Sequence, residues 1–309
     1  MKVVDVHVHL FPEDVVDAYM ENYSAHSSLP AACRPTLQQL FREYEGIDVL
    51  KYVILQEWES TKPFESKNIR LAAESDRFYN RCYFYYINKW LAKIQSENSK
   101  LLCFGGIHPD DSDCVAELDR LVQEYKLGGL KLVPCMQHFF LTDRRLFPAY
   151  EKAEAAGMPV LVHTGADPVP GCELFGHPRD VDVIASAFPR LVIIMAHMGV
   201  PFFHETKEVL AKHENVFTDL SGAVVYDEVR AFAARHRIDP SFLSQLTRES
   251  WSSTLSTLMK DMGLERVLFG SDFPFIRPAV ALEAFLQLDL PDEGKERILW
   301  KNAREILKI

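Results

Sequence analysis

Short runs of apolar, mostly β-branched residues recur along the 309-residue chain and alternate with segments of helical periodicity. Continuous apolar runs of this length are typical of parallel strands that are covered on both faces. They predict strands at residues 3–8, 51–56, 101–107, 128–133, 159–163, 191–196, 215–219 and 266–270. Strands that alternate with helices in this number favour an α/β fold, a parallel sheet closed into a (β/α)8 TIM barrel.

Several of the intervening helices have clear ends in the sequence. Residues 144–156 form an amphipathic segment that stops at Gly157, and Pro159 follows shortly after. Glycine and then proline are common where a helix ends. The segments 179–187 and 203–213 also have helical patterns and end before a proline and an asparagine. We expect helices at all of these places.

The predicted strands are unevenly spaced along the chain. The gaps after strands 1, 2 and 7 are much longer than the others, and we interpret the excess as loop insertions at residues 12–46, 60–100 and 224–262. No linker or change in composition marks a boundary between domains. Residues 1–309 are therefore expected to form a single TIM-barrel domain with insertions.

Composition narrows the class of protein. The chain is 48% hydrophobic, which argues against disorder, and its formal charge of −10 argues against broad nucleic-acid binding. No apolar run approaches the roughly 18 residues of a membrane span, and the first residues do not read as a signal peptide. The six cysteines form no CxxC pair, which favours a reduced, cytoplasmic protein. We expect a small-molecule substrate and neither nucleic acid nor membrane as partner; the sequence leaves open a homo-oligomer such as a dimer.

Strand 1 carries the most informative polar residues, in the order Asp5-Val6-His7-Val8-His9. Side chains alternate across a strand, so we expect Asp5 and both histidines to face the barrel interior and the valines to face the helices. Buried polar groups without partners cost about 1–3 kcal/mol each, so a shared cation explains this group better than isolated core histidines. In this arrangement Asp5 is expected to orient a ligand imidazole.

Later strands end in further polar residues. His163 follows strand 5 in VLVHTG, His197 follows strand 6 in VIIMAHMG, and Asp272 follows strand 8 in VLFGSDFPF, where Gly270 allows close approach. Each has an ordinary structural explanation when taken alone, such as a helix cap or a turn. Together they supply four imidazoles and a carboxylate, a set suited to zinc or a similar divalent ion. In a TIM barrel the carboxyl ends of the strands converge on the face where active sites are built.

These motifs resemble the amidohydrolase superfamily, in which HxH, two later histidines and an aspartate follow one another on a (β/α)8 barrel. The surrounding segments are similar to its amidohydrolase-related (amidohydrolase 2) branch, namely DVHVHLFP, GLKLVP, PVLVHTG, VIIMAHMG, DLSG, LFGSDFPF and the closing KNAREIL. That branch includes metal-dependent hydrolases and aminocarboxymuconate-semialdehyde-type decarboxylases. The resemblance implies that a divalent metal, with Zn²⁺ favoured and one ion favoured over two, is bound by His7, His9, His163 and Asp272. It assigns His197 either to proton transfer or to a second metal.

Other polar residues are weaker candidates for a second metal or for substrate binding. Lys131, in GLKLVP on strand 4, matches the position of a carboxylated lysine in binuclear relatives. A salt-bridged lysine, or an ammonium that binds a substrate carboxylate, is favoured over that carbamate. His108 precedes a proline, so loop structure explains it, although it could line the pocket. Arg179 could contact an anionic substrate.

Three functions are compatible with these residues. The leading hypothesis is a metal-dependent hydrolase, in which a metal-activated water attacks an amide, lactone or ester carbonyl of a small, carboxylated substrate. Asp272 would take the proton of that water, and His197 would stabilise the developing charge. The alternative is a metal-dependent non-oxidative decarboxylase of a small unsaturated or aromatic acid. A metal-free barrel with a binding or lactonase role is the third hypothesis.

Overall fold

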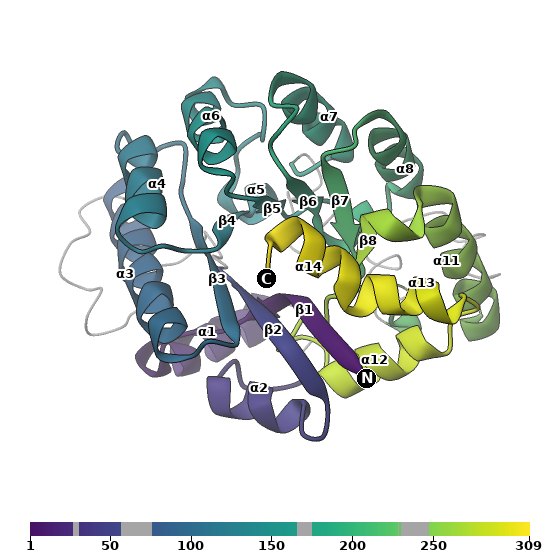
Figure 1. The fold of residues 1–309 in the computed structure, drawn as a ribbon. Helices are drawn as coiled ribbons and strands as arrows, with labels where there is room; N and C mark the ends of the chain where they lie inside the picture. Colours follow the sequence, from purple (N-terminus) through teal and green to yellow (C-terminus); the bar gives the residue numbers. More distant parts are fainter. Residues whose placement is uncertain (27–30, 57–75, 166–174, 228, 230–246) are drawn as a thin grey trace.

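The computed structural model describes residues 1–26, 31–56, 76–165, 175–227, 229 and 247–309 (Figure 1). Its strands form one eight-stranded sheet in which each strand pairs in parallel with the next along the chain. The strands are β1 (Lys2–His9), β2 (Asp48–Leu55), β3 (Leu101–Gly106), β4 (Gly129–Leu132), β5 (Val160–Val162), β6 (Ile193–Met195), β7 (Val216–Asp219) and β8 (Val267–Leu268). All eight predicted strands are confirmed, with ends that differ by a few residues.

The last strand returns to the first. The backbone N–H of Val6 donates to the carbonyl of Phe269 at 2.9 Å, and that of Asp272 donates to the carbonyl of His7 at 3.0 Å. The sheet is therefore a nearly closed barrel, as the sequence predicted. The hydrogen bonds that close the barrel involve the backbone of His7 and Asp272. The same backbone segments therefore close the barrel and position these two side chains.

Helices surround the barrel (Figure 1). The described helices are α1 (Glu13–His26), α2 (Leu37–Glu43), α3 (Asp76–Glu97), α4 (Cys114–Gln123), α5 (Pro134–Gln137), α6 (Phe147–Ala156), α7 (Pro178–Ala187), α8 (Phe203–Lys212), α11 (Arg248–Met262), α12 (Pro278–Leu286), α13 (Asp292–Glu296) and α14 (Asn302–Leu307). The helices predicted at 144–156, 179–187 and 203–213 are confirmed by α6, α7 and α8. Gly157 ends α6 in the left-handed conformation, with φ of 63°, which glycine adopts without strain. No helix in the described part of the chain is both long and apolar enough to cross a membrane.

The expected insertions contain helices where the structure describes them. Residues 12–46 hold α1 and α2, while α3 and α11 lie within the other two insertions. Residues 60–75, 228 and 230–246 of those insertions lie outside the described residues.

The apolar residues form an outer and an inner layer. The outer cluster includes Val3 and Val8 together with helix residues such as Leu118 of α4. The inner cluster includes Val4 and Val6 and is covered by the C-terminal segment through Trp300, Ile306, Leu307 and Ile309. Figure 1 shows α14 and the C-terminus over the middle of the ring of strands. This segment covers one end of the barrel, and the polar site lies at the other end.

A β-bulge in β1 overturns part of the predicted strand pattern. Asp5 pairs with Tyr52 and Val8 with Ile54, so three steps along β1 match two steps along β2. The prediction that the valines all face the helices is wrong for Val4 and Val6, which pack in the inner cluster. The extra residue resets the alternation of side chains, which a count along the sequence does not reveal.

Candidate metal centre

The two histidines of β1 lie together at the mouth of the barrel. His7 and His9 are buried, and their Nε2 atoms are 3.1 Å apart. Nδ1 of His7 lies 2.8 Å from Oδ2 of Asp219, and Nδ1 of His9 lies 3.4 Å from the carbonyl of Leu55. Because each Nδ1 faces an acceptor, we infer that each neutral ring carries its proton there and keeps a lone pair on Nε2.

Asp272 brings a carboxylate oxygen to the same place from the segment after β8. Its Oδ1 atom lies 3.6 Å from Nε2 of His7 and 3.7 Å from Nε2 of His9. This oxygen is buried and accepts no hydrogen bond. Gly270 permits the approach, because a Cβ there would lie 2.7 Å from Cβ of His7. The structure thus confirms the close approach that the sequence predicted at Gly270.

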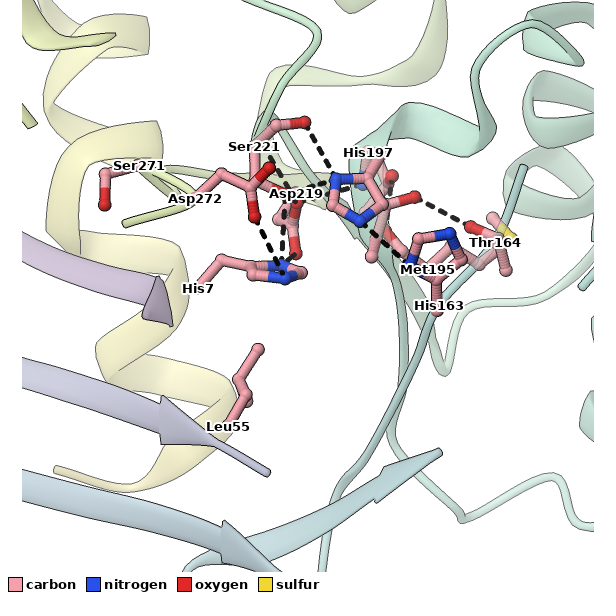
Figure 2. A network of polar contacts seen from close by, with 12 residues as sticks. His7, Leu55, His163, Thr164, Met195, His197, Asp219, Ser221, Ser271 and Asp272 are labelled. Carbon is pink, nitrogen blue, oxygen red and sulfur yellow. Dashed lines mark hydrogen bonds and ion pairs between the residues drawn. The ribbon is translucent and has the colours of Figure 1, made fainter. Parts of the chain in front are cut away.

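His197 and His163 extend this group across the mouth (Figure 2). Nδ1 of His197 lies 3.1 Å from the carbonyl of Ser221, and its Nε2 lies 3.2 Å from Nδ1 of His163. We infer that His163 donates its Nδ1 proton to His197 and keeps a lone pair on Nε2. Ligand atoms of His7, His197 and Asp272 lie within 4.8 Å of one another, so His197 belongs to the same group of potential metal ligands.

The electrostatics of the centre favour neutral imidazoles beside an ionised carboxylate. Burial lowers the pKa of His7 to about 3, although Asp219 acts in the opposite direction. Burial likewise lowers the pKa values of His9 and His163. Burial alone would raise the pKa of Asp272, but the neighbouring imidazoles outweigh it and lower that pKa. At neutral pH this is the protonation state in which such groups bind a metal.

These residues fit a divalent cation. Two imidazole lone pairs and a carboxylate oxygen converge at 3.1, 3.6 and 3.7 Å from one another. Ligand atoms at about 2.1 Å from a metal are about 3.0–3.4 Å apart, so a small contraction would complete the coordination. Nitrogen and oxygen donors of this kind suit zinc, manganese and similar ions. A cation at this point would satisfy the buried Oδ1 of Asp272.

Asp219 and Ser221 support the centre, and the sequence analysis gave neither of them a role. Oδ1 of Asp219 accepts from the backbone N–H of His197 and from that of Ser221, both at 3.0 Å. The Ser221 hydroxyl lies 2.8 Å from Nδ1 of His197 and 3.0 Å from Nδ1 of His7. These residues belong to the DLSG segment, so the family resemblance was the signal that could have indicated them.

Asp5 does not orient a ligand imidazole, so that expectation is wrong. Its carboxylate accepts from the backbone N–H groups of His7 at 3.1 Å and Ser271 at 2.9 Å, and from the Tyr44 hydroxyl at 2.5 Å. Burial raises the pKa of Asp5 to about 6. Asp5 therefore connects β1 to the segment that carries Asp272, while Asp219 contacts the His7 ring.

The weaker candidates lie at different distances from the centre. Lys131 is 1% exposed on β4, and its charge lowers the pKa values of His7, His9 and His163, which places it near them. The structure does not bring His108 or Arg179 into this group of candidate ligands.

In His108, Nδ1 accepts from the N–H of Asp110 at 3.1 Å, and Nε2 lies 3.0 Å from the carbonyl of Gln137. Both ring nitrogens are therefore engaged by backbone groups, as expected of a histidine that holds a loop. The side chain of Arg179 is 70% exposed and lies 3.8 Å from Glu205, so it points away from the centre.

The fold and the site together define a TIM-barrel enzyme with a His/Asp centre suited to a divalent metal. The chain belongs to the Amidohydrolase family, whose model matches residues 4–309. The resemblance seen in the motifs is thereby confirmed over almost the whole chain.

Curated proteins similar to this chain are named as decarboxylases. The chain is 26% identical over 245 residues to 2-amino-3-carboxymuconate-6-semialdehyde decarboxylase of Dictyostelium discoideum, covering 72% of this chain and 65% of that protein. The match thus spans slightly less than two thirds of the relative's length.

Two solved structures share the fold at low identity. The 5-carboxyvanillate decarboxylase of Sphingomonas paucimobilis matches with a TM-score of 0.66 and 16% identity, covering 100% of this chain and 99% of that one. The dihydroxybenzoic acid decarboxylase of Polaromonas, solved with manganese and 2-nitroresorcinol, matches with a TM-score of 0.66 and 14% identity, covering 99% and 97%.

These comparisons overturn the leading functional hypothesis. The sequence analysis favoured a hydrolase, whereas these relatives are named as decarboxylases. The same histidines and aspartate can serve either reaction, so the error arose in assigning chemistry to a shared set of ligands. The relatives support the alternative of decarboxylation over hydrolysis.

Proposed function

We propose that this protein is a metal-dependent non-oxidative decarboxylase of a small unsaturated or aromatic carboxylic acid. The observation that carries the proposal is the buried Oδ1 of Asp272, which faces the lone pairs of His7 and His9 without a hydrogen bond. A divalent cation would satisfy all three acceptors at this spacing. The decarboxylases among the relatives supply the reaction class.

The metal would be held by His7, His9 and Asp272, with His163 contributing Nε2. When bound, a divalent ion here supplies positive charge that holds the substrate carboxylate and stabilises negative charge on neighbouring substrate oxygens. Lys131 adds a second positive charge at the level of β4, where it can orient an anionic substrate. Both the zinc favoured by the sequence and the manganese of the Polaromonas relative suit these donors.

Decarboxylation requires one proton and no water. The bond between the substrate carbon and its carboxylate breaks, the electron pair stays on that carbon, and CO₂ leaves. The carbon then takes a proton, so the protein must deliver one to it in each turnover. We assign delivery of this proton to His197, because a ring nitrogen of His197 lies within 4.8 Å of ligand atoms of His7 and Asp272, and Ser221 holds the ring in place through Nδ1.

Product analysis tests the proposal directly. The chelated protein is reloaded with Mn²⁺ or Zn²⁺ and incubated with 2,6-dihydroxybenzoate, 5-carboxyvanillate and other unsaturated acids, and with phenyl esters and lactones. We expect CO₂ release from at least one acid and, in D₂O, one deuterium at the carbon that carried the carboxylate. Ester or lactone hydrolysis with no CO₂ from any acid would contradict the proposal.

A cytoplasmic location is part of the proposal. The side chains of Cys33, Cys103, Cys114 and Cys135 are buried thiols that form no disulfide with one another, as is common in a reducing compartment. Cell fractionation with a compartment marker would test this location, and recovery with an oxidising compartment would contradict it.

A further inference from the structure

Gln56, directly after β2, has an unexplained buried amide. The side chain is 1% exposed, and neither Nε2 nor Oε1 forms a hydrogen bond. Buried side-chain amides normally have partners, because they lose their hydrogen bonds to water. An amide with both of its polar atoms unpaired therefore indicates a site that a ligand can complete.

The position of the amide follows from alternation along β3. Phe104 packs in the inner cluster, whereas a Cβ at Gly105 would meet Asn88 and helix residues on the outer side. Gly106, two residues after Phe104, faces inward again, and a Cβ there would lie 2.4 Å from Oε1 of Gln56. The missing side chain of Gly106 thus makes room for the Gln56 amide at the carboxyl end of β2 and β3.

The amide lies beside the metal centre along the rim of the barrel. On one side, the residue before Gln56 is Leu55, which pairs with His9 and whose carbonyl is 3.4 Å from Nδ1 of that histidine. On the other side, Gly106 pairs with Lys131 of β4. Gln56 is therefore placed between a candidate metal ligand and the buried lysine.

Aromatic rings lie near the amide. A Cβ at Gly106 would also lie 2.6 Å from Cε1 of Phe84, so the Phe84 ring lies close to the Gln56 amide. The Phe84 ring lies 6.4 Å from that of His108, which in turn packs on Phe139 at 5.5 Å. None of these described neighbours is a carboxylate, and aromatic rings suit the face or edge of a planar unsaturated ligand.

We propose that Gln56 forms a neutral subsite that recognises a hydroxyl group on the substrate, which would be a planar unsaturated or aromatic hydroxy acid. A hydroxyl can accept from Nε2 and donate to Oε1, so it satisfies both atoms of the amide. A second carboxylate offers only acceptors. It could accept from Nε2 but would leave Oε1 facing another oxygen without a hydrogen bond. This inference rests on the proposed function, since it places the substrate carboxylate at the metal centre.

Binding measurements separate this subsite from catalysis. Dissociation constants of benzoate, the three monohydroxybenzoates and the matching methoxybenzoates are measured by calorimetry with Mn²⁺-loaded protein. Catechol and resorcinol, which lack the carboxylate, serve as further probes. We expect one hydroxy isomer to bind about five- to tenfold more tightly than its methoxy counterpart, which cannot donate a hydrogen bond. The variant Gln56→Leu should lose this preference, and Gln56→Asn should weaken it.

The matched control is Gln287→Leu, because Gln287 is exposed at the end of α12. Circular dichroism and metal content verify that each variant is folded and loaded. A hydroxyl preference that survives in Gln56→Leu, or no such preference in the wild type for either acids or phenols, would overturn the inference. Gln56-dependent binding of hydroxylated ligands without CO₂ release would keep the subsite and reject the decarboxylase proposal.

Discussion

Oδ2 of Asp219 lies 2.8 Å from Nδ1 of His7, so a carboxylate at the end of β7 fixes the imidazole presented by β1. The contact sets the tautomer of His7 and turns its Nε2 lone pair toward His9 and Asp272. Carboxylates that hold a ligand histidine in this way raise its basicity and orient its ring. The opposite Oδ1 of Asp219 also holds the backbone of His197. One side chain thereby positions both a candidate ligand and the candidate proton donor.

Asp219→Asn should weaken metal binding by about 10- to 100-fold, because the amide no longer favours the proton on Nδ1 of His7. Competition with a fluorescent chelator measures the dissociation constant for Mn²⁺ or Zn²⁺. Asp261→Asn is the control, since Asp261 is an exposed partner of Lys207. Equal metal affinity in both variants would rule out this role for Asp219.

His197→Asn should lower the rate of CO₂ release by about 10²–10⁴-fold, the usual effect of removing a general acid. Metal content should stay near one ion per chain, because His7, His9, His163 and Asp272 remain. Elemental analysis and turnover are measured on the same preparation. Loss of the metal together with activity would instead assign His197 to ligation.

The metal-free protein should lose stability on acidification. Because folding lowers the pKa of His7 from 6.5 to about 3, the unfolded chain binds more protons between these values. The free energy of unfolding should therefore fall by a few kcal/mol as the pH drops through this window. Asp5 acts in the opposite direction, since its raised pKa of about 6 favours the folded state at lower pH.

Urea titrations of the chelated protein at several pH values measure this dependence. His7→Gln should show a shallower loss of stability between pH 6.5 and 3 than the wild type, because it removes one group with a lowered pKa. The same slope in both proteins would show that His7 does not control the acid response.

Tyr44→Phe should destabilise the protein by about 1–3 kcal/mol, because it removes a hydrogen bond to the buried carboxylate of Asp5. Tyr52→Phe is the control: Tyr52 packs against Tyr44 with ring centroids 5.3 Å apart. Among the described residues, the Tyr52 hydroxyl donates no hydrogen bond to Asp5, so its removal should change the free energy of unfolding little. Thermal or urea unfolding measures both, and equal stability losses would refute the special role of the Tyr44 hydroxyl.

Much of the fold could be predicted because the strands are continuous apolar runs, such as 191–196, that are buried on both faces. The end of α6 was equally clear, since Gly157 is a residue that adopts a positive φ without strain. The residues His7, His9, His163 and Asp272 were predicted as ligands because they lie on or shortly after strands, and barrel geometry gathers strand ends.

The supporting residues were harder to predict for physical reasons. Asp219 contacts His7 across more than 200 residues of sequence, and no local pattern encodes that contact. Gln56 is a polar residue after an apolar run, which is how many loops begin. The choice between hydrolysis and decarboxylation depends on how the substrate is held above the metal, which ligand spacing does not specify.

The bulge in β1 has a consequence for redesign of this barrel. The extra residue between Asp5 and Val8 lets one strand place Val6 in the apolar interior and His7 in the polar mouth. Deleting one residue there would rotate every following side chain to the opposite face, His9 included. Transplanting the centre into another barrel would thus require the length of this strand as well as its two histidines.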